Sequence, residues 1–201
     1  MQRAEFLYAA GMPSQSYVVH DPKVLRAIAH PVRNRILTEL GAQGSLRAAD
    51  IARELGIPAN QASFHLRQLA KYGLVEEDPA AARDRRDRVW RPAAAGLTVN
   101  LKDLEESPGG KAASAVYRRN AASWGQLIID TALNRREPGT HTSLSDSALR
   151  LTKDEASQLS FELNEVVERW AERNRGSDDS RRTYLYYAAI LPHPKLEPDD
   201  R

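Results

Sequence analysis

The stretch "IARELGIPANQASFHLRQLAKYGLVEED", residues 51–78, contains two helical patterns, a turn between them and an extended run at the end. Apolar residues recur at helical spacing in each pattern: Ile51, Ala52 and Leu55 in the first, and Ala62, Leu66 and Leu69 in the second. Gly56 suits the tight turn between them, and Pro58 suits the start of the second helix. Two short helices in this arrangement predict a helix-turn-helix.

The flanking residues extend this prediction in both directions. Asp21 can cap a short helix that runs through Ala29, and Pro31 begins a second helix to about Leu40. After Gly73, "LVEED" and "RVWRP" predict two short strands, joined by the loop "PAAARDRRD". A helix-turn-helix followed by a basic hairpin predicts a winged helix. The alternative for "RDRRDR" is a solvated charge run that is partly self-paired through its two aspartates.

The outer face of the predicted second helix is rich in hydrogen-bond donors. If the apolar residues point inward, Asn60, Phe64, Arg67 and Lys71 project outward, with Gln61 and Gln68 beside them. Asn and Gln can bind adenine through two hydrogen bonds, and Arg can bind guanine in the same way. Phe64 departs from the expected polar character; it could contact a thymine methyl group or pack under the wing.

The segment "VLRAIAHPVRNRILTELGAQGSLRAADIARELGIPANQASFHLRQLAKYGLVEED" resembles the ArsR-type winged-helix transcriptional regulators. The resemblance rests on "HPVRNRIL", "IARELGI", S-x-H-L-x-x-L and "GLV" in this order, and it covers about residues 18–99. It implies DNA binding, with the second helix of the pair in the major groove. Ser63 and His65 lie nearer the flank of that helix, where a phosphate contact or a structural hydrogen bond is the alternative to base reading.

The wing arginines are expected to approach phosphates or the minor groove beside the recognition site. Arg47 and Arg53, on the first helix of the pair, are further candidates. The predicted DNA-contacting residues are Asn60, Gln61, Ser63, Phe64, His65, Arg67, Gln68, Lys71, Arg83, Arg85, Arg86 and Arg88.

Composition narrows the other possibilities. With 201 residues and 41% hydrophobic content, the chain can form two modest domains. It contains no cysteine, which excludes disulfides, thiol catalysis and thiolate metal sites. No apolar run approaches the roughly 20 residues that span a bilayer, and no signal peptide is evident, so we expect a cytoplasmic protein without membrane contact. Residues 1–100 carry 14 Lys and Arg against 10 Asp and Glu, so the basic half is the N-terminal one.

The remaining residues predict a second unit. Turn signals at residues 100–110 are followed by a helix over 111–136, a short strand "ALRL", a helix to about Arg175 that starts at the capping box "TKDE", and a strand "TYLYYAAIL". We therefore expect a mainly α fold with small β elements (α+β). It comprises an N-terminal arm (1–20), a winged helix-turn-helix domain (21–99) and a helix-strand-helix-strand C-terminal domain (111–192).

Apolar stripes on the two long helices could join two copies of the chain, although packing within one copy is the alternative. A homodimer would address both halves of a pseudo-palindromic double-stranded operator. Aromatic side chains in this half could also line a pocket for a small apolar or aromatic effector. The residues assigned to the dimer interface or the effector pocket are Tyr117, Trp124, Ile128, Leu159, Leu163 and Trp170.

The favoured function is sequence-specific transcriptional regulation, with repression by promoter occlusion. We expect no metal and no other cofactor, because His20, His141 and His193 fall in different loops without ligand spacing. The alternative is a winged-helix module that binds protein instead of DNA. An enzyme is not expected, since the sequence contains no phosphate-binding glycine loop, no G-x-S-x-G and no H-E-x-x-H.

Overall fold

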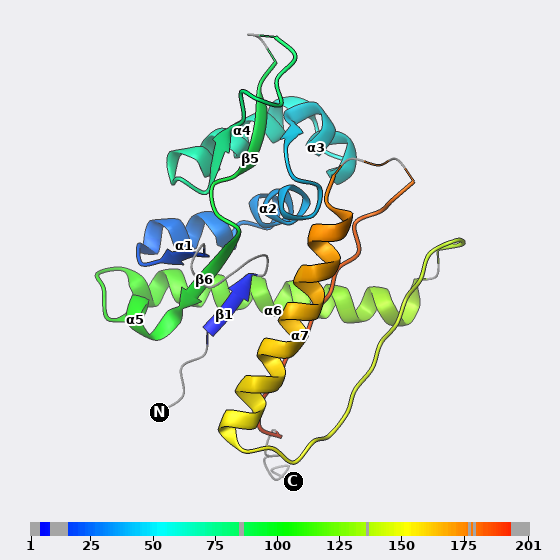
Figure 1. The fold of residues 1–201 in the computed structure, drawn as a ribbon. Helices are drawn as coiled ribbons and strands as arrows, with labels where there is room; N and C mark the ends of the chain where they lie inside the picture. Colours follow the sequence, from blue (N-terminus) through cyan, green and yellow to red (C-terminus); the bar gives the residue numbers. More distant parts are fainter. Residues whose placement is uncertain are drawn as a thin grey trace.

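The structure is a computed structural model that describes residues 5–8, 16–84, 87–135, 137–176, 178 and 180–193 (Figure 1). Its helices are α1 (Pro22–Ala29), α2 (Pro31–Gln43), α3 (Ala48–Leu55), α4 (Ala59–Lys71), α5 (Leu101–Glu105), α6 (Gly110–Asn134) and α7 (Lys153–Asn174). Its strands are β1 (Glu5–Tyr8), β2 (Ser16–Val19), β3 (Leu46–Arg47), β4 (Val75–Glu77), β5 (Val89–Pro92) and β6 (Gly96–Asn100). The predicted α+β class is confirmed. Arg85 and Arg86 of the predicted wing lie outside the described residues.

The helix boundaries in the first half follow from local signals. The Asp21 carboxylate accepts a hydrogen bond from the backbone N–H of Lys23 at 2.7 Å and so caps α1. Helix α2 continues three residues beyond the predicted Leu40, because the left-handed residue that ends it is Gly44, with φ of 87°. Gly56, with φ of 63°, ends α3 and makes the turn into α4. The helix-turn-helix is thus confirmed.

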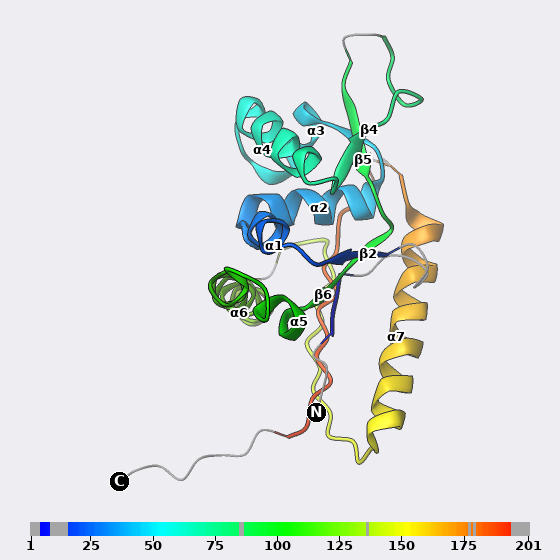
Figure 2. The same ribbon diagram turned by 90° about the vertical axis from the view of Figure 1, so that its left-hand side faces the viewer.

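The wing is an antiparallel hairpin of β4 and β5, and β3 pairs with the outer side of β5. Trp90 of β5 faces both Leu46 of β3 and Glu77 of β4 in register, and its side chain is buried in the core. This packing holds the base of the wing against the helices. The wing loop projects from the same end of the molecule as α3 and α4 (Figures 1 and 2).

A second sheet, with strand order β1-β6-β2, was not evident from the sequence. Strand β6 pairs with β1 in antiparallel and with β2 in parallel orientation. Val19 of β2 and Val99 of β6 are both fully buried. Two pieces of the predicted N-terminal arm are therefore strands. Local patterns did not reveal them, because their pairing partner lies about 80 or more residues further along the chain.

One hydrophobic core extends from Val19 to Tyr117. Its largest fully buried side chains include Leu25, Ile28, Ile36, Leu40, Ile51, Leu66 and Leu69. The core includes Leu101 and Leu104 of α5, and the first half of α6 packs along α1. It therefore continues past residue 99, where the sequence predicts the end of the winged helix-turn-helix domain. Over the described residues, no helix combines the length and apolar character needed to cross a membrane.

Beyond α6 the described residues add nothing to the buried core. Helix α7 contains no buried residue, and residues 140–152 and 181–193 are extended. The predicted strands "ALRL" and "TYLYYAAIL" are wrong for the described residues, because these segments pair with no strand there. They run between α6 and α7 (Figure 2). Few polar contacts hold them: the Thr183 hydroxyl donates to the Glu39 carboxylate at 2.7 Å, and the backbone N–H of His141 donates to the Tyr184 hydroxyl at 3.2 Å.

Candidate nucleic-acid interface

Helix α4 separates its residues into a buried and an exposed face. Its buried residues are Ala62, His65, Leu66 and Leu69. Its exposed residues include Asn60, Gln61, Phe64, Arg67 and Lys71, while Ser63 and Gln68 are half-buried at the margins. The structure therefore brings the predicted α4 residues to one exposed face, with His65 placed beneath it.

The exposed face of α4 is electropositive. The helix contains Arg67 and Lys71 and no carboxylate, and neither cation has an ion-pair partner among the described residues. The side-chain oxygen of Asn60 accepts the backbone N–H of Gln61 at 2.9 Å, which leaves the amide nitrogen of Asn60 to donate outward. Such donors match the acceptors of DNA bases and phosphates.

Phe64 interrupts this polar surface. Its side chain is 49% exposed, and its ring meets His65 edge-on with 5.3 Å between ring centroids. The exposed part of the ring is available to a thymine methyl group, while its inner edge rests on the imidazole of His65.

Arginines of the wing, of α3 and at the end of β3 are largely engaged by carboxylates. Arg47, predicted on the first helix of the pair, is the last residue of β3 and precedes α3. Arg88 lies 3.6 Å from Glu77, and Arg47 lies 3.5 Å from Asp87. Arg53 contacts two acidic residues of its own helix. Arg83 is exposed. Because an arginine that already has an acidic partner gains less from a phosphate, these residues contribute less net positive charge than their number suggests.

The wing is anchored at its first loop residue, Asp78. Its backbone N–H donates to the carbonyl of Val89 at 2.8 Å, and its carboxylate accepts from the Ser45 hydroxyl at 2.5 Å. The Ser45 hydrogen bond and the backbone N–H groups of Ala80 and Ala81 hold the pKa of Asp78 below its usual value. The sequence analysis did not single out Asp78 or Ser45; an Asp at the end of a strand, before Pro79, was the available signal.

The six residues assigned to a dimer interface or an effector pocket have different environments. Tyr117 is buried in the core, with 3% of its surface exposed. Trp124, Ile128 and Leu159 are half-buried, and Leu163 and Trp170 are exposed. The Arg173 guanidinium lies over the ring of Trp170, 4.0 Å from its centroid. The structure does not bring these six residues together in one pocket.

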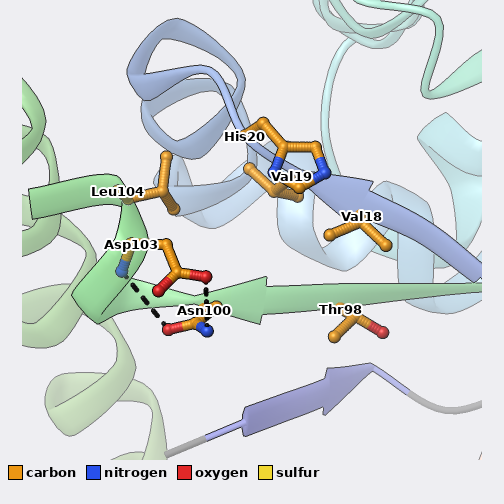
Figure 3. A pocket seen from close by; sticks show the side chains of 7 residues that line it. All are labelled: Val18, Val19, His20, Thr98, Asn100, Asp103 and Leu104. Carbon is orange, nitrogen blue, oxygen red and sulfur yellow. Dashed lines mark hydrogen bonds between the residues drawn. The ribbon is translucent and has the colours of Figure 1, made fainter. Parts of the chain in front are cut away.

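A cavity of about 280 Å³ lies between β2, β6 and α5 (Figure 3). It is lined by Val18, Val19, His20, Thr98, Asn100, Asp103 and Leu104. Asn100 and Asp103 bond to each other, since the amide nitrogen of Asn100 donates to the Asp103 carboxylate at 2.8 Å and the Asn100 side-chain oxygen accepts the backbone N–H of Asp103. The cavity contains none of the aromatic residues proposed to bind an effector. Among the described residues, no cluster of three or more His, Asp or Glu is arranged to hold a metal ion.

Comparison with known proteins agrees with this geometry. Residues 28–78 match a family model described as a helix-turn-helix domain. These residues contain the end of α1, all of α2, α3 and α4, and the first wing strand, β4. They form a helix-turn-helix domain, and the hairpin that follows adds the wing. No curated protein sequence matches the chain.

Three solved structures show a weak similarity to the chain. The first is the homodimeric winged helix-turn-helix DNA-binding domain of Mb0332 from Mycobacterium bovis, a possible ArsR-family transcriptional regulator: 24% identity, 59% of this chain and 88% of that chain covered, TM-score 0.30. The second is a ZitR mutant from Lactococcus lactis in apo form. It is 17% identical, the match covers 71% of this chain and 83% of that chain, and the TM-score is 0.29. The third is wild-type apo MarR from E. coli: 16% identity, 73% and 88% covered, TM-score 0.32. All three TM-scores lie below 0.5, so the similarity in overall structure is weak.

Proposed function

We propose that this protein is a sequence-specific transcriptional regulator of the ArsR-like winged-helix type that binds double-stranded DNA as a homodimer. The observation that carries the proposal is the outer face of α4, which combines amide donors and cations, lacks carboxylates and lies at the wing end of the molecule. A solvated surface helix would carry charges of both signs. A helix face that carries hydrogen-bond donors and positive charges but no carboxylate fits the acceptors and phosphates of the DNA major groove.

Each residue of this face has a proposed role. Asn60, Gln61 and Arg67 read base edges, because their side chains can form paired hydrogen bonds with purines. Lys71 binds a phosphate as a point charge. The wing arginines position the protein on the backbone of the DNA without reading its sequence.

The surface of the second half supports a homodimer. Large apolar side chains of α6, α7 and residues 181–193 are exposed. The aromatic ones are 50–59% exposed: Phe161, Trp170, Tyr184, Tyr186 and Tyr187.

The area of these aromatic side chains agrees with an interface. At about 200 Å² for each side chain, they leave roughly 550 Å² uncovered in one copy. A stable interface takes about 800 Å² from each partner. We therefore assign this surface to a second copy of the chain and not to an effector pocket. Two copies would address the two halves of an inverted repeat, and repression would follow from occupation of the promoter.

A protein-binding winged helix is the competing function. It requires that the exposed polar residues of α4 are dispensable and that an apolar surface carries the affinity. The exposed apolar surface does exist in this protein, but most of it lies on the second half of the chain, and α4 contributes only Phe64 to it.

Selection of bound sequences from a random duplex library tests the proposal. The wild type should enrich an inverted repeat, and a variant with Asn60, Gln61 and Arg67 all changed to Ala should not. A matched variant with exposed residues of the same types on α6 changed to Ala should retain the motif: Arg119, Gln126 and Asn134. Light scattering on all three proteins checks that each remains a dimer. If no motif is enriched and binding is weak and salt-sensitive, the protein-binding function is favoured instead.

A further inference from the structure

Two imidazole rings meet between the recognition helix and the corner of α1 and α2. His30 is the residue between these two helices, and His65 lies on the buried face of α4 with 5% of its surface exposed. Their ring centroids are 4.7 Å apart, with 43° between the ring planes. The pair therefore connects α4, which carries the proposed base-reading residues, directly to the start of α2.

The hydrogen bonding of the pair indicates that both rings are neutral. The Nδ1 atoms of His30 and His65 are buried and have no hydrogen-bond partner in the part of the chain that the structure describes. His30 also does not use its side chain to cap α2. A neutral imidazole can leave one ring nitrogen without a proton, whereas an imidazolium must donate from both nitrogens. Adding a proton at either Nδ1 would bury an N–H group without an acceptor, which is costly.

The charges around the pair also oppose protonation. The Arg33 guanidinium is fixed in the same corner, because its Nε donates to the carbonyl of Ala27 at 2.6 Å and its terminal nitrogen donates to that of Arg26 at 3.1 Å. Burial lowers the pKa of His30 and of His65, and the charge of Arg33 lowers both further. A backbone hydrogen bond raises the pKa of His30 in part, but the net direction for both groups is downward.

The elements packed around the pair supply no opposing carboxylate. From α1, Arg26 points toward the carbonyl of Gly109 at 3.5 Å. At the end of α4, Tyr72 interacts with Arg33. Within the described residues, the charges that act on the two imidazoles come from Arg33 and, for His30, from His65. A proton on this pair is therefore not compensated by any carboxylate among the described residues.

We propose that the His30–His65 contact is a latch that holds α4 in its DNA-binding position while both rings are neutral, and that protonation releases it. A protonated ring must turn toward water to satisfy its new N–H group, and the contact between the two rings is then lost. The corner itself stays in place, because the amide nitrogen of Asn120 in α6 donates to the carbonyl of Ala29 at 2.9 Å. The displacement consequently falls on α4.

This latch gives DNA binding an unusual dependence on pH. In the unfolded chain each histidine has a pKa near 6.5, and in the folded chain both values are lower. The neutral pair is therefore fully favourable above pH about 6.5, and its contribution to stability is lost as the pH falls from there toward the folded-state pKa values. Simple electrostatics predicts the opposite for DNA affinity, because protonated histidines attract phosphates.

The deciding experiment measures operator affinity by fluorescence anisotropy from pH 8 to about 5.5 at constant ionic strength. The inference rests on the proposed DNA binding, so the operator comes from the library selection above. The wild type should lose affinity on acidification, by up to about tenfold per pH unit for each proton that binding must release, once the pH is below the folded-state pKa values. A variant with His30→Gln and His65→Gln should show a much flatter profile, because the amides do not titrate. The variant with His20→Gln and His141→Gln, which changes exposed histidines, should behave like the wild type.

Two measurements on the free protein remain decisive if the double variant does not fold or if no operator is found. Titration of the five histidines by NMR should show two with pKa values below those of the others. Hydrogen exchange, corrected for its intrinsic pH dependence, should show loss of protection in residues 59–71 at pH about 5.5, with circular dichroism unchanged. Affinity that is constant or rises on acidification overturns the latch, and so does unchanged protection of α4. Absence of an operator combined with acid-sensitive protection refutes only the proposed DNA-binding function.

Discussion

Replacing Lys71 with Ala should make DNA binding less sensitive to salt while leaving the preferred sequence unchanged. Lys71 is exposed in the last turn of α4 and has no acidic partner among the described residues. Each neutralised phosphate contributes about 0.9 to the slope of log affinity against log salt concentration. A dimer presents two copies of Lys71, so the slope should fall by about 1.8. Between about 50 and 200 mM salt, the wild type should then lose roughly 12-fold more affinity than the variant.

The assay is a set of anisotropy titrations at four salt concentrations with the selected operator. Lys102→Ala is the matched control: it removes the same charge from an exposed position on α5, which lies far from α4 in both views (Figures 1 and 2). Its slope should equal that of the wild type. Equal slopes for Lys71→Ala and the wild type would refute a phosphate contact. An equal decrease in both variants would show that net charge, and not the α4 face, controls the salt dependence.

Further predictions concern the scaffold that presents α4. Gly110→Ala should severely destabilise the protein, because an added Cβ would lie 1.7 Å from a backbone oxygen of α5. At Gly56 an added Cβ would have no atom within 4 Å. Gly56→Ala should therefore cost only about 1–2 kcal/mol, because alanine is strained in the left-handed backbone conformation. Urea unfolding compares the two, and similar losses would contradict this reasoning. Leu66→Ala should cost about 2–5 kcal/mol in the same assay, since Leu66 is fully buried; a loss below 1 kcal/mol, an order-of-magnitude limit, would mean that the core refills the space. Ser45→Ala should reduce the loss of stability on acidification. The Ser45 hydrogen bond lowers the pKa of Asp78 in the folded protein, so the Asp78 carboxylate stabilises the fold at pH values above its unfolded-state pKa. This stabilisation disappears as the pH falls through the folded-state pKa of Asp78. Identical acid sensitivity in Ser45→Ala and the wild type would exclude this hydrogen bond as the cause.

The sequence predicted the winged helix-turn-helix half well because its signals are local. Gly56 marks a left-handed turn, Asp21 caps a helix, and the inner residues of α4 recur at helical spacing. Each signal acts within a few residues, where short-range sterics and hydrogen bonds dominate. The same periodicity placed Arg67 and Lys71 on the exposed face of α4, and the structure places them there.

Features that depend on distant contacts were not predicted. Strand β6 alternates buried Leu97 and Val99 with more exposed residues, but the run is only five residues long, and its hydrogen-bond partners β1 and β2 lie far away in the sequence. "TYLYYAAIL" has the composition of a strand, but composition cannot provide a neighbouring strand, and the described chain contains none for it. His30 was hidden for a similar reason: its ring contact is made with a residue 35 positions away.

The parallel pairing of β2 with β6 ties the entry of the helix-turn-helix region to its exit. Residues 16–19 lead into α1, and residues 96–100 follow the wing. The pairing of β2 with β6 therefore joins the two ends of the segment that contains the helix-turn-helix and the wing. A force applied through α7 and α6 reaches β6 along the chain before it reaches the wing. A circular permutant of this segment could accordingly have its new chain ends in the exposed wing loop. A short linker would then connect β6 to β2, and α4 would stay packed against the core.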